Sequence, residues 1–171
     1  MNAAPPILVV MGVAGSGKTT LGRLIAERLG WAFKEGDELH PPANVDKMRS
    51  GRPLNDADRG PWLDAIGRWI DGSIAAGQSG VITCSALKRA YRDRLRQGRP
   101  SLTFVYLDIA EPVVAERLKH RKGHYWPASL LHTQYVDLEV PGDDEPVIRV
   151  DGELGLEAEA DAVVGSLARA R

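Results

Sequence analysis

The chain has 171 residues, of which 43% are hydrophobic and 26% are charged, and its formal net charge is −1 at pH 7. This composition is that of an ordinary globular domain, and it excludes disorder, collagen and coiled coil. A net charge near zero argues against broad nucleic-acid or membrane surfaces, so we expect neither partner. The single cysteine, Cys84, excludes an internal disulfide and a cysteine-based zinc site. Together with a start that does not resemble a leader, this favours a cytoplasmic protein.

Apolar segments rich in β-branched residues alternate with amphipathic segments along the chain. The pattern predicts five strands, at residues 7–11, 32–35, 80–84, 102–107 and 147–150. It predicts helices at residues 19–29, 58–76, 88–96, 111–121, 129–138 and 156–170. Proline- and glycine-rich stretches such as Pro41-Pro42 are interpreted as loops within one domain, residues 1–171. The alternation is typical of an α/β fold with a parallel sheet between two layers of helices.

The stretch from Gly12 to Thr19 reads GVAGSGKT and lies between the first predicted strand and the first predicted helix. It matches G-x-x-x-x-G-K-[ST], in which backbone N–H groups and a helix N-terminus bind phosphate. Lys18 is expected to act on the β- and γ-phosphates of ATP as a catalytic residue, and the Thr19 hydroxyl to bind Mg²⁺. A dinucleotide-binding loop is the nearer alternative, but Thr20 stands where its third glycine is required. The candidate nucleotide-binding residues are Gly12, Gly15, Ser16, Gly17, Lys18, Thr19 and Thr20.

Acidic residues distinguish between the classes of protein that share this loop. Residues 44–47 read NVDK, which is the wrong order for the guanine-binding N-K-x-D of GTPases. Asp108 follows an apolar strand as a metal-binding carboxylate would, but we interpret it as the cap of the helix that begins near Glu111. The third predicted strand ends in TCSA at residues 83–86, without an acid. Mg²⁺ is therefore expected on Thr19, phosphate and water.

A carboxylate, Asp37, follows the second predicted strand in the sequence GDELH. Ligands gather at the carboxyl ends of parallel strands, so Asp37 is expected beside the phosphate loop. There it could accept the proton of an attacking hydroxyl or orient that hydroxyl toward the γ-phosphate, with His40 as the next candidate. The alternative is a loop acid that satisfies local N–H groups. The cations that follow favour a small anionic acceptor, although a solvated charged face has the same composition: Lys47, Arg49, Arg52 and Arg59.

Three stretches are far more specific than the phosphate loop. They are GDELHP through PLNDADRGPWL within residues 36–63, CSALKRAYRDRLR at 84–96, and RLKHRKGH at 117–124. Together they closely resemble the bacterial gluconokinases of the thermoresistant type. The resemblance implies ATP-dependent phosphorylation of D-gluconate to 6-phospho-D-gluconate, by in-line transfer with Mg²⁺. It also implies a shikimate- and adenylate-kinase-like P-loop fold with strand order 2-3-1-4-5, and a possible homodimer.

The resemblance further implies an acceptor site, with Arg59 and Lys88 as the preferred partners of the gluconate carboxylate. Its candidate residues are Asp37, His40, Lys47, Arg49, Arg59, Ser85, Lys88 and His124, with Arg89 and Arg92 as further contacts to the carboxylate or a hydroxyl. Where related kinases hold the adenine base, this sequence has residues 151–153.

Arg117 and Arg121 are four residues apart on one predicted helix, so they are expected to share a face. They resemble the arginines of a kinase lid, here at about residues 120–130, that close over the phosphates of ATP. Both are therefore candidate nucleotide-binding residues, and Arg121 is a candidate catalytic residue. The alternative is a basic helix end that complements the helix dipole.

Two other functions stay open at this point. One is a shikimate-like or nucleoside-monophosphate-like small-molecule kinase, and the other is a regulator that binds nucleotide without a small acceptor. A kinase requires Asp37 and the basic residues to converge on one pocket, and a regulator does not.

Overall fold

A five-stranded parallel sheet forms the centre of the protein, in a computed structural model that describes residues 3–121 and 127–170. The strands are β1 (Ile7–Met11), β2 (Ala32–Lys34), β3 (Gly80–Thr83), β4 (Leu102–Asp108) and β5 (Val147–Asp151). They lie in the order β2-β3-β1-β4-β5, and each neighbouring pair is parallel. The predicted order is confirmed, and so are the five predicted strands, whose ends differ by at most one residue.

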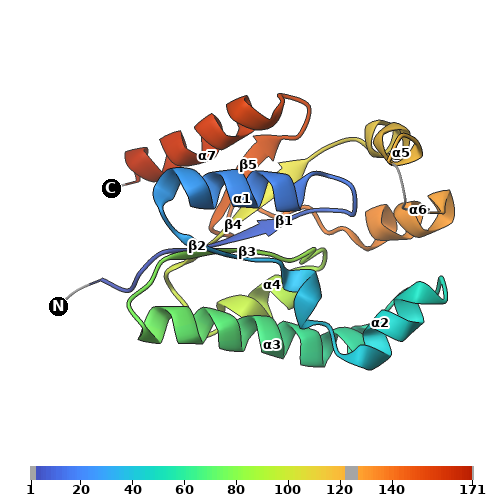
Figure 1. The fold of residues 1–171 in the computed structure, drawn as a ribbon, viewed down its shortest axis with the longest axis horizontal. Helices are drawn as coiled ribbons and strands as arrows, with labels where there is room; N and C mark the ends of the chain where they lie inside the picture. The colour runs from blue at the N-terminus through green and yellow to red at the C-terminus, as the bar shows by residue number, and fades with distance from the viewer. Residues whose placement is uncertain (1–2, 122–126, 171) are drawn as a thin grey trace.

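Helices cover both faces of the sheet, so the predicted three-layer α/β fold is also confirmed (Figure 1). One face carries α1 (Lys18–Leu29) and α7 (Leu156–Arg169), and the other carries α3 (Asp56–Ala75) and α4 (Arg89–Arg96). Beyond the carboxyl ends of the strands lie α2 (Pro42–Arg49), α5 (Glu111–Lys119), α6 (Ala128–Asp137) and the 3-10 turn η1 (Gly36–Leu39). No helix in the two described ranges is long and apolar enough to cross a membrane.

The central strand β1 is apolar on both of its faces. Ile7, Val9 and Met11 pack toward α3 and α4, whereas Leu8 and Val10 pack toward α1 and α7. All five side chains are at most 1% exposed. Successive residues of a strand point to opposite faces, so a strand covered on both faces has a continuous apolar sequence. This is why an apolar run without alternation marks β1 in the sequence.

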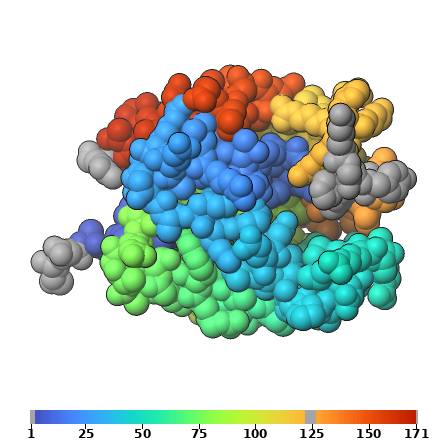
Figure 2. Space-filling view, viewed as in Figure 1, coloured from blue at the N-terminus to red at the C-terminus, as the bar shows by residue number. Residues whose placement is uncertain are grey.

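The loops that leave β1, β2 and β3 meet at one edge of the sheet. Two backbone hydrogen bonds join the end of β1 and its loop to the loop after β3: Cys84 N donates to Val10 O (3.0 Å), and Gly12 N donates to Ser85 O (3.2 Å). Parallel sheets bind their ligands at this edge. In the space-filling view a hollow opens here, with α2 on one side and α5 with α6 on the other (Figure 2).

Two helical segments differ from the prediction. Residues 42–49, where no helix is predicted, form α2; Pro42 is its first residue, a position at which the missing N–H of proline costs nothing. The helix predicted over 111–121 ends at Lys119, and His120 is its C-cap. Arg121 therefore lies outside the helix, and the prediction that Arg117 and Arg121 share a helical face is wrong.

Asp108 does not cap α5, contrary to the interpretation made from the sequence. The residue before α5 is Ala110, and no side chain caps this helix in the described structure. Asp108 Oδ2 instead accepts hydrogen bonds from Arg149 Nε (2.9 Å) and Nη2 (2.6 Å). Because β4 extends through Asp108 and pairs with β5, the carboxylate joins two strands, and its role is structural.

Candidate active site

The phosphate loop, residues 12–19, leaves β1 and continues into the first turn of α1. Its three glycines have positive φ angles, 146° at Gly12, 78° at Gly15 and 99° at Gly17. Residues with a Cβ rarely adopt such angles, so the loop needs glycine at these positions. Gly17 is the N-cap of α1, and no described side chain caps this helix end. The first N–H groups of α1 are thus available to an anion.

Two side chains of the loop fit a bound triphosphate. Lys18 Nζ donates hydrogen bonds to Gly12 O (3.0 Å) and Val13 O (2.8 Å), so the lysine folds over the loop. The Ser16 hydroxyl is buried, and it has no hydrogen-bond partner within the described residues. A buried polar atom without a partner is costly, and a phosphate oxygen would supply the missing partner. Thr20 is exposed in the first turn of α1.

The surroundings of Lys18 bring the predicted catalytic residues together. Burial lowers the pKa of Lys18, while the carboxylates of Asp37 and Glu35 raise it. The Arg121 guanidinium lowers the Lys18 pKa, as a like charge does. Lys18, Asp37 and Arg121 are therefore close enough to interact, although they come from three separate segments of the chain.

Glu35, which no sequence pattern singled out, lies between the phosphate loop and β3. Thr19 Oγ1 donates a hydrogen bond to its Oε2, and Thr83 Oγ1 donates to its Oε1 (2.5 Å). A hydroxyl beside a carboxylate offers the oxygen ligands that Mg²⁺ prefers, so Thr19 and Glu35 fit the ion. The expectation that Mg²⁺ is held by Thr19, phosphate and water considered acids at the ends of the third and fourth strands, and it left out Glu35. The signal was a glutamate at the end of the second predicted strand.

Asp37 lies in η1, directly after the point where the backbones of β2 and β3 come closest. No side chain fits at Gly36, because its Cβ would lie 1.8 Å from Thr83 O; Gly36 N also donates to Thr83 Oγ1 (2.9 Å). The Asp37 side chain is 77% exposed, so a substrate hydroxyl can reach the carboxylate. Its pKa is raised, because desolvation by the neighbouring protein and the Glu35 charge outweigh the Lys18 charge, which lowers it.

His40 and Trp62 form the wall behind Asp37. Their rings stack with centroids 4.1 Å apart and planes 16° from parallel. Trp62 Nε1 donates a hydrogen bond to Gly36 O (2.9 Å), which fixes the indole against η1. Trp62 is 2% exposed, so the indole belongs to the core.

The hydrogen bonds of His40 define its tautomer. Asn44 Nδ2 lies 3.3 Å from His40 Nδ1 and donates to Asp58 O (2.8 Å). The two hydrogens of the amide nitrogen serve both acceptors, so the imidazole proton is on Nε2, 3.9 Å from Asp37 Oδ1. Burial, followed by the charge of Arg59, lowers the pKa of His40 to about 4. His40 is therefore neutral at pH 7.

Replacing His40 by phenylalanine should make the free energy of unfolding depend less on pH in the acidic range. The unfolded chain takes up a proton near pH 6.5 and the folded protein only near pH 4, so stability falls as the pH drops through this window. The loss due to His40 is about 1–3 kcal/mol, the lower values allowing for screening by water. The measurement is the free energy of unfolding from pH 4 to 8 for wild type and His40→Phe. Equal slopes in the two proteins would contradict the assignment.

The first turns of α3 and α4 form a basic wall, which includes Arg59, a charge close enough to lower the pKa of His40. Arg59 Nη1 donates to Tyr91 OH (3.1 Å), and Lys88 Nζ donates to Asp56 Oδ1 (3.0 Å). The Tyr91 hydroxyl also donates to Asp56 Oδ1, and both cations lie over the Tyr91 ring, 5.5 and 5.7 Å from its centroid. The structure thus brings the preferred pair, Arg59 and Lys88, together. Asp56 and Tyr91 complete the wall, and sequence reasoning did not identify them.

The other predicted acceptor residues lie in different environments, and they do not all face one pocket. Lys47 Nζ donates to Asp58 Oδ2 (2.6 Å), so its charge is already paired. Arg49 is exposed at the last residue of α2. Ser85 lies between β3 and α4 beside the phosphate loop. Arg92 is fully buried, so its prediction as an acceptor contact is wrong.

The lid prediction falls partly outside the described residues. His124 and the segment 122–126 belong to that part of the chain. Arg117 Nη2 donates a hydrogen bond to Gly152 O (2.9 Å), in the loop after β5. Arg117 therefore joins α5 to the segment predicted to hold the adenine base, whereas Arg121 lies toward Lys18.

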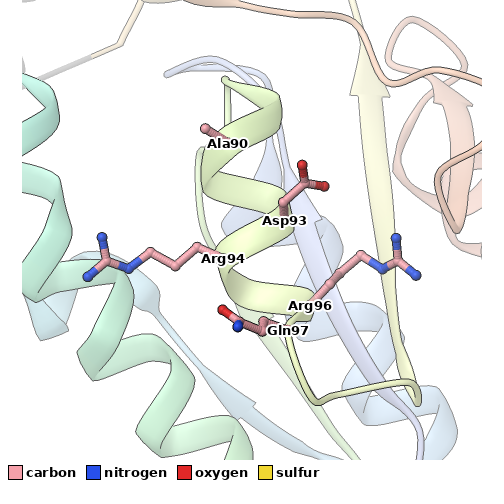
Figure 3. A pocket seen from close by; sticks show the side chains of 5 residues that line it. All are labelled: Ala90, Asp93, Arg94, Arg96 and Gln97. Carbon is pink, nitrogen blue, oxygen red and sulfur yellow. The ribbon is translucent and has the colours of Figure 1, made fainter.

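A shallow depression on the outer surface of α4 is separate from this site. It is lined by Ala90, Asp93, Arg94, Arg96 and Gln97 (Figure 3). Arg94 extends toward α3, where it binds the Asp64 carboxylate with two hydrogen bonds (3.0 and 2.9 Å). Arg96 extends to the opposite side of the helix, so the two arginines do not converge on one ligand.

Comparisons with known proteins show which proteins this chain resembles. A family model described as an AAA domain matches residues 8–125. Gluconokinase of Gluconobacter oxydans (strain 621H) is 56% identical over 153 residues, covering 90% of this chain and 86% of that protein. Thermoresistant gluconokinase of Escherichia coli (strain K12) is 46% identical over 144 residues, covering 84% and 82%. The crystal structure of a gluconokinase from Sinorhizobium meliloti 1021 matches with a TM-score of 0.88 and 47% identity, covering 99% of this chain and 95% of that one.

A parallel sheet of order 2-3-1-4-5, a phosphate loop after its first strand and a carboxylate after its edge strand define a P-loop small-molecule kinase. The similarity of the relatives extends over most of the chain, far beyond the phosphate loop. The chain belongs to the gluconokinase family, and the resemblance recognised from its motifs is confirmed.

Proposed function

We propose that the protein transfers the γ-phosphoryl group of ATP to D-gluconate and so forms 6-phospho-D-gluconate. The observation that carries this proposal is the position of Asp37. Its exposed carboxylate lies between the lysine of the phosphate loop and a wall that contains Arg59 and Lys88. The names of the relatives support gluconate as the acceptor.

On the nucleotide side, the chain supplies positive charge and N–H groups. Lys18 neutralises the charge that grows on the β- and γ-phosphate oxygens during transfer, and Arg121 adds a second cation to the same region. Thr19 and Glu35 would hold Mg²⁺, which when bound supplies further neutralisation of the phosphates. Arg117 and the loop at Gly152 are our candidates for contacts to the nucleoside.

On the acceptor side, the primary hydroxyl of gluconate faces Asp37 and its carboxylate faces the basic wall. Asp37 orients the hydroxyl toward the γ-phosphate and accepts its proton. His40 is neutral, so it packs beside Asp37 without attracting the gluconate carboxylate away from Arg59 and Lys88. Arg59 and Lys88 bind the carboxylate by charge-assisted hydrogen bonds.

The test compares kcat/KM for gluconate, glucose and shikimate at the same ATP and Mg²⁺ concentrations. Gluconate and glucose share a primary hydroxyl, but only gluconate has a carboxylate. Two charge-assisted contacts of about 1.5–3 kcal/mol each predict a preference for gluconate of roughly 10²–10⁴-fold. Comparable values for glucose would refute carboxylate recognition, and a preference for shikimate would favour the alternative kinase.

A matched pair of variants connects this preference to the basic wall. Lys88→Met should reduce the preference for gluconate over glucose by about 10-fold or more, because one charged contact is lost. Arg94→Met, a change of similar size on α4 at a cation paired with Asp64, should leave the preference unchanged. Equal effects of the two variants would remove Lys88 from the acceptor site.

Three further properties stay predictions. A single catalytic domain over residues 1–171 is supported by the single sheet of the described residues, on which α1, α3, α4 and α7 pack. A homodimer is supported by the family resemblance alone, and light scattering would test it. A cytoplasmic location is supported by the consumption of ATP.

A further inference from the structure

Arg92 of α4 is fully buried although it is charged. Its side chain is 0% exposed, and that of its partner Glu145 is 1% exposed. Arg92 Nε and Nη2 donate to the two carboxylate oxygens of Glu145 (2.7 and 3.2 Å). The remaining N–H groups donate to three carbonyls, Ala86 O (2.8 Å), Leu87 O (3.0 Å) and Glu139 O (2.8 Å). All five donors of the guanidinium are therefore used.

Two of the three carbonyls that Arg92 binds, those of Ala86 and Leu87, belong to a strained turn. Ala86 has a φ of 45°, and it is the one non-glycine residue with positive φ among those described. Such an angle is unfavourable for a residue with a Cβ, so the surroundings must hold it in place. Arg92 binds the carbonyl of Ala86 itself and that of the next residue.

The turn lies between the two halves of the proposed site. The residue before Ala86, Ser85, accepts a hydrogen bond from Gly12 N at the start of the phosphate loop (3.2 Å). The residue after Leu87 is Lys88, a cation of the basic wall. Leu87 O also accepts from Glu139 N (2.8 Å), so the chain between α6 and β5 closes around the same turn.

Stability alone is a weak reason for such a pair. Burying two charges carries a large desolvation cost, and an apolar pair of the same volume is often as stable. An apolar pair, however, could not bind three carbonyl oxygens. The feature that requires arginine is therefore the geometry of the turn.

We propose that Arg92 and Glu145 are positioning residues that hold the turn 84–87 in its strained conformation and thereby set Lys88 relative to the phosphate loop. The pair acts on acceptor binding through this turn, without contact to the substrate. Glu145 fixes the orientation of the guanidinium. The Glu145 carboxylate is itself held by Gly142 N, which donates a hydrogen bond to its Oε2 (2.9 Å). The hydrogen bonds to Glu145 and the Arg92 charge outweigh the effect of burial and keep its pKa low.

The test uses one substitution and its rescue in the full-length enzyme. Arg92→Lys keeps the charge but donates from a single atom, so it cannot reproduce the fork of the guanidinium. We expect its KM for gluconate to rise at least fivefold, while the Kd for ATP changes less than twofold. Adding Ala86→Gly should return the KM to within twofold of wild type, because glycine adopts this φ without strain. The melting temperature should stay low in both variants, since the buried pair is not restored.

A merely structural pair gives a different result. Lower melting temperature with an unchanged KM for gluconate, or failure of Ala86→Gly to restore the KM, would overturn the proposal. If Arg92→Lys does not fold, Glu145→Gln with and without Ala86→Gly answers the same question, because it keeps the shape of the carboxylate and removes its charge.

The proposal rests on the proposed function only in using gluconate as the acceptor. If the wild-type enzyme does not phosphorylate gluconate, the proposed function fails, and the turn is then measured by amide hydrogen exchange at residues 84–88. Exchange should accelerate at least fivefold in Arg92→Lys and slow again in the double variant. Unchanged exchange would overturn the positioning role whatever the acceptor is.

Discussion

Lys18→Ala should abolish phosphoryl transfer while leaving a folded protein. The lysine contributes nothing to the apolar core, and its ammonium group bonds only to carbonyls of its own loop, Gly12 O and Val13 O, in the described structure. Removing it takes away a positive charge that stabilises the growing charge on the β- and γ-phosphates, which costs roughly 10³-fold in kcat. The measurement is turnover with saturating ATP and gluconate, next to the melting temperature.

Lys119→Ala is the matched control for this experiment. Its side chain is 71% exposed and pairs only loosely with Glu116, at 3.6 Å. The same loss of charge and length should there change kcat by less than twofold. Turnover of Lys18→Ala close to that of the control would remove the phosphate loop from the mechanism.

Asp37→Asn should lower kcat by about 10²–10⁴-fold, the usual contribution of a positioned general base. The amide has nearly the shape of the carboxylate but cannot accept the proton of the acceptor hydroxyl. ATP binding should persist, because the phosphate loop is unchanged. Kinetics at saturating gluconate, with ATP affinity from titration, separate the two effects.

Glu38→Gln is the control, since it makes the same chemical change one residue away. Glu38 is 60% exposed and pairs with Lys34 (2.9 Å).

The pH profile of kcat gives a second test of Asp37. Because the pKa of Asp37 is raised, the wild-type kcat should fall as the pH drops through that pKa, and Asp37→Asn should lack this acidic limb. Activity of Asp37→Asn within a few-fold of wild type would mean that Asp37 only orients the hydroxyl.

Features that depend on neighbouring residues could be predicted from the sequence. The phosphate loop is contiguous, so its glycines, Lys18 and Thr19 identify it without knowledge of the fold. The strands could be placed because burial on both faces leaves continuous apolar runs. α2 was missed because Pro41-Pro42 is typical of a loop, although proline is also a favourable first residue of a helix.

Features that depend on contacts between distant segments could not be predicted. Arg92 belongs to a basic stretch, and spacing alone does not show that it points inward to Glu145, 53 residues away. Glu35 becomes a candidate ligand only when β2 brings it to Thr19. Asp56 and Tyr91 likewise meet only because α3 and α4 pack side by side. Each of these side chains acquires its role from the tertiary fold.

The close approach at Gly36 limits how this enzyme can be redesigned. Any side chain there would collide with the backbone of β3, so β2 would have to move and would carry Asp37 away from the phosphate loop. The edge that holds the reactive carboxylate is therefore unsuitable for engineering. The wall on α3 and α4 consists of helix side chains, of which Asp56 is exposed and Arg59 and Lys88 are half-buried, and these can be changed without moving a strand. A search for variants with new acceptors is best confined to that wall, where specificity can change while the chemistry stays in place.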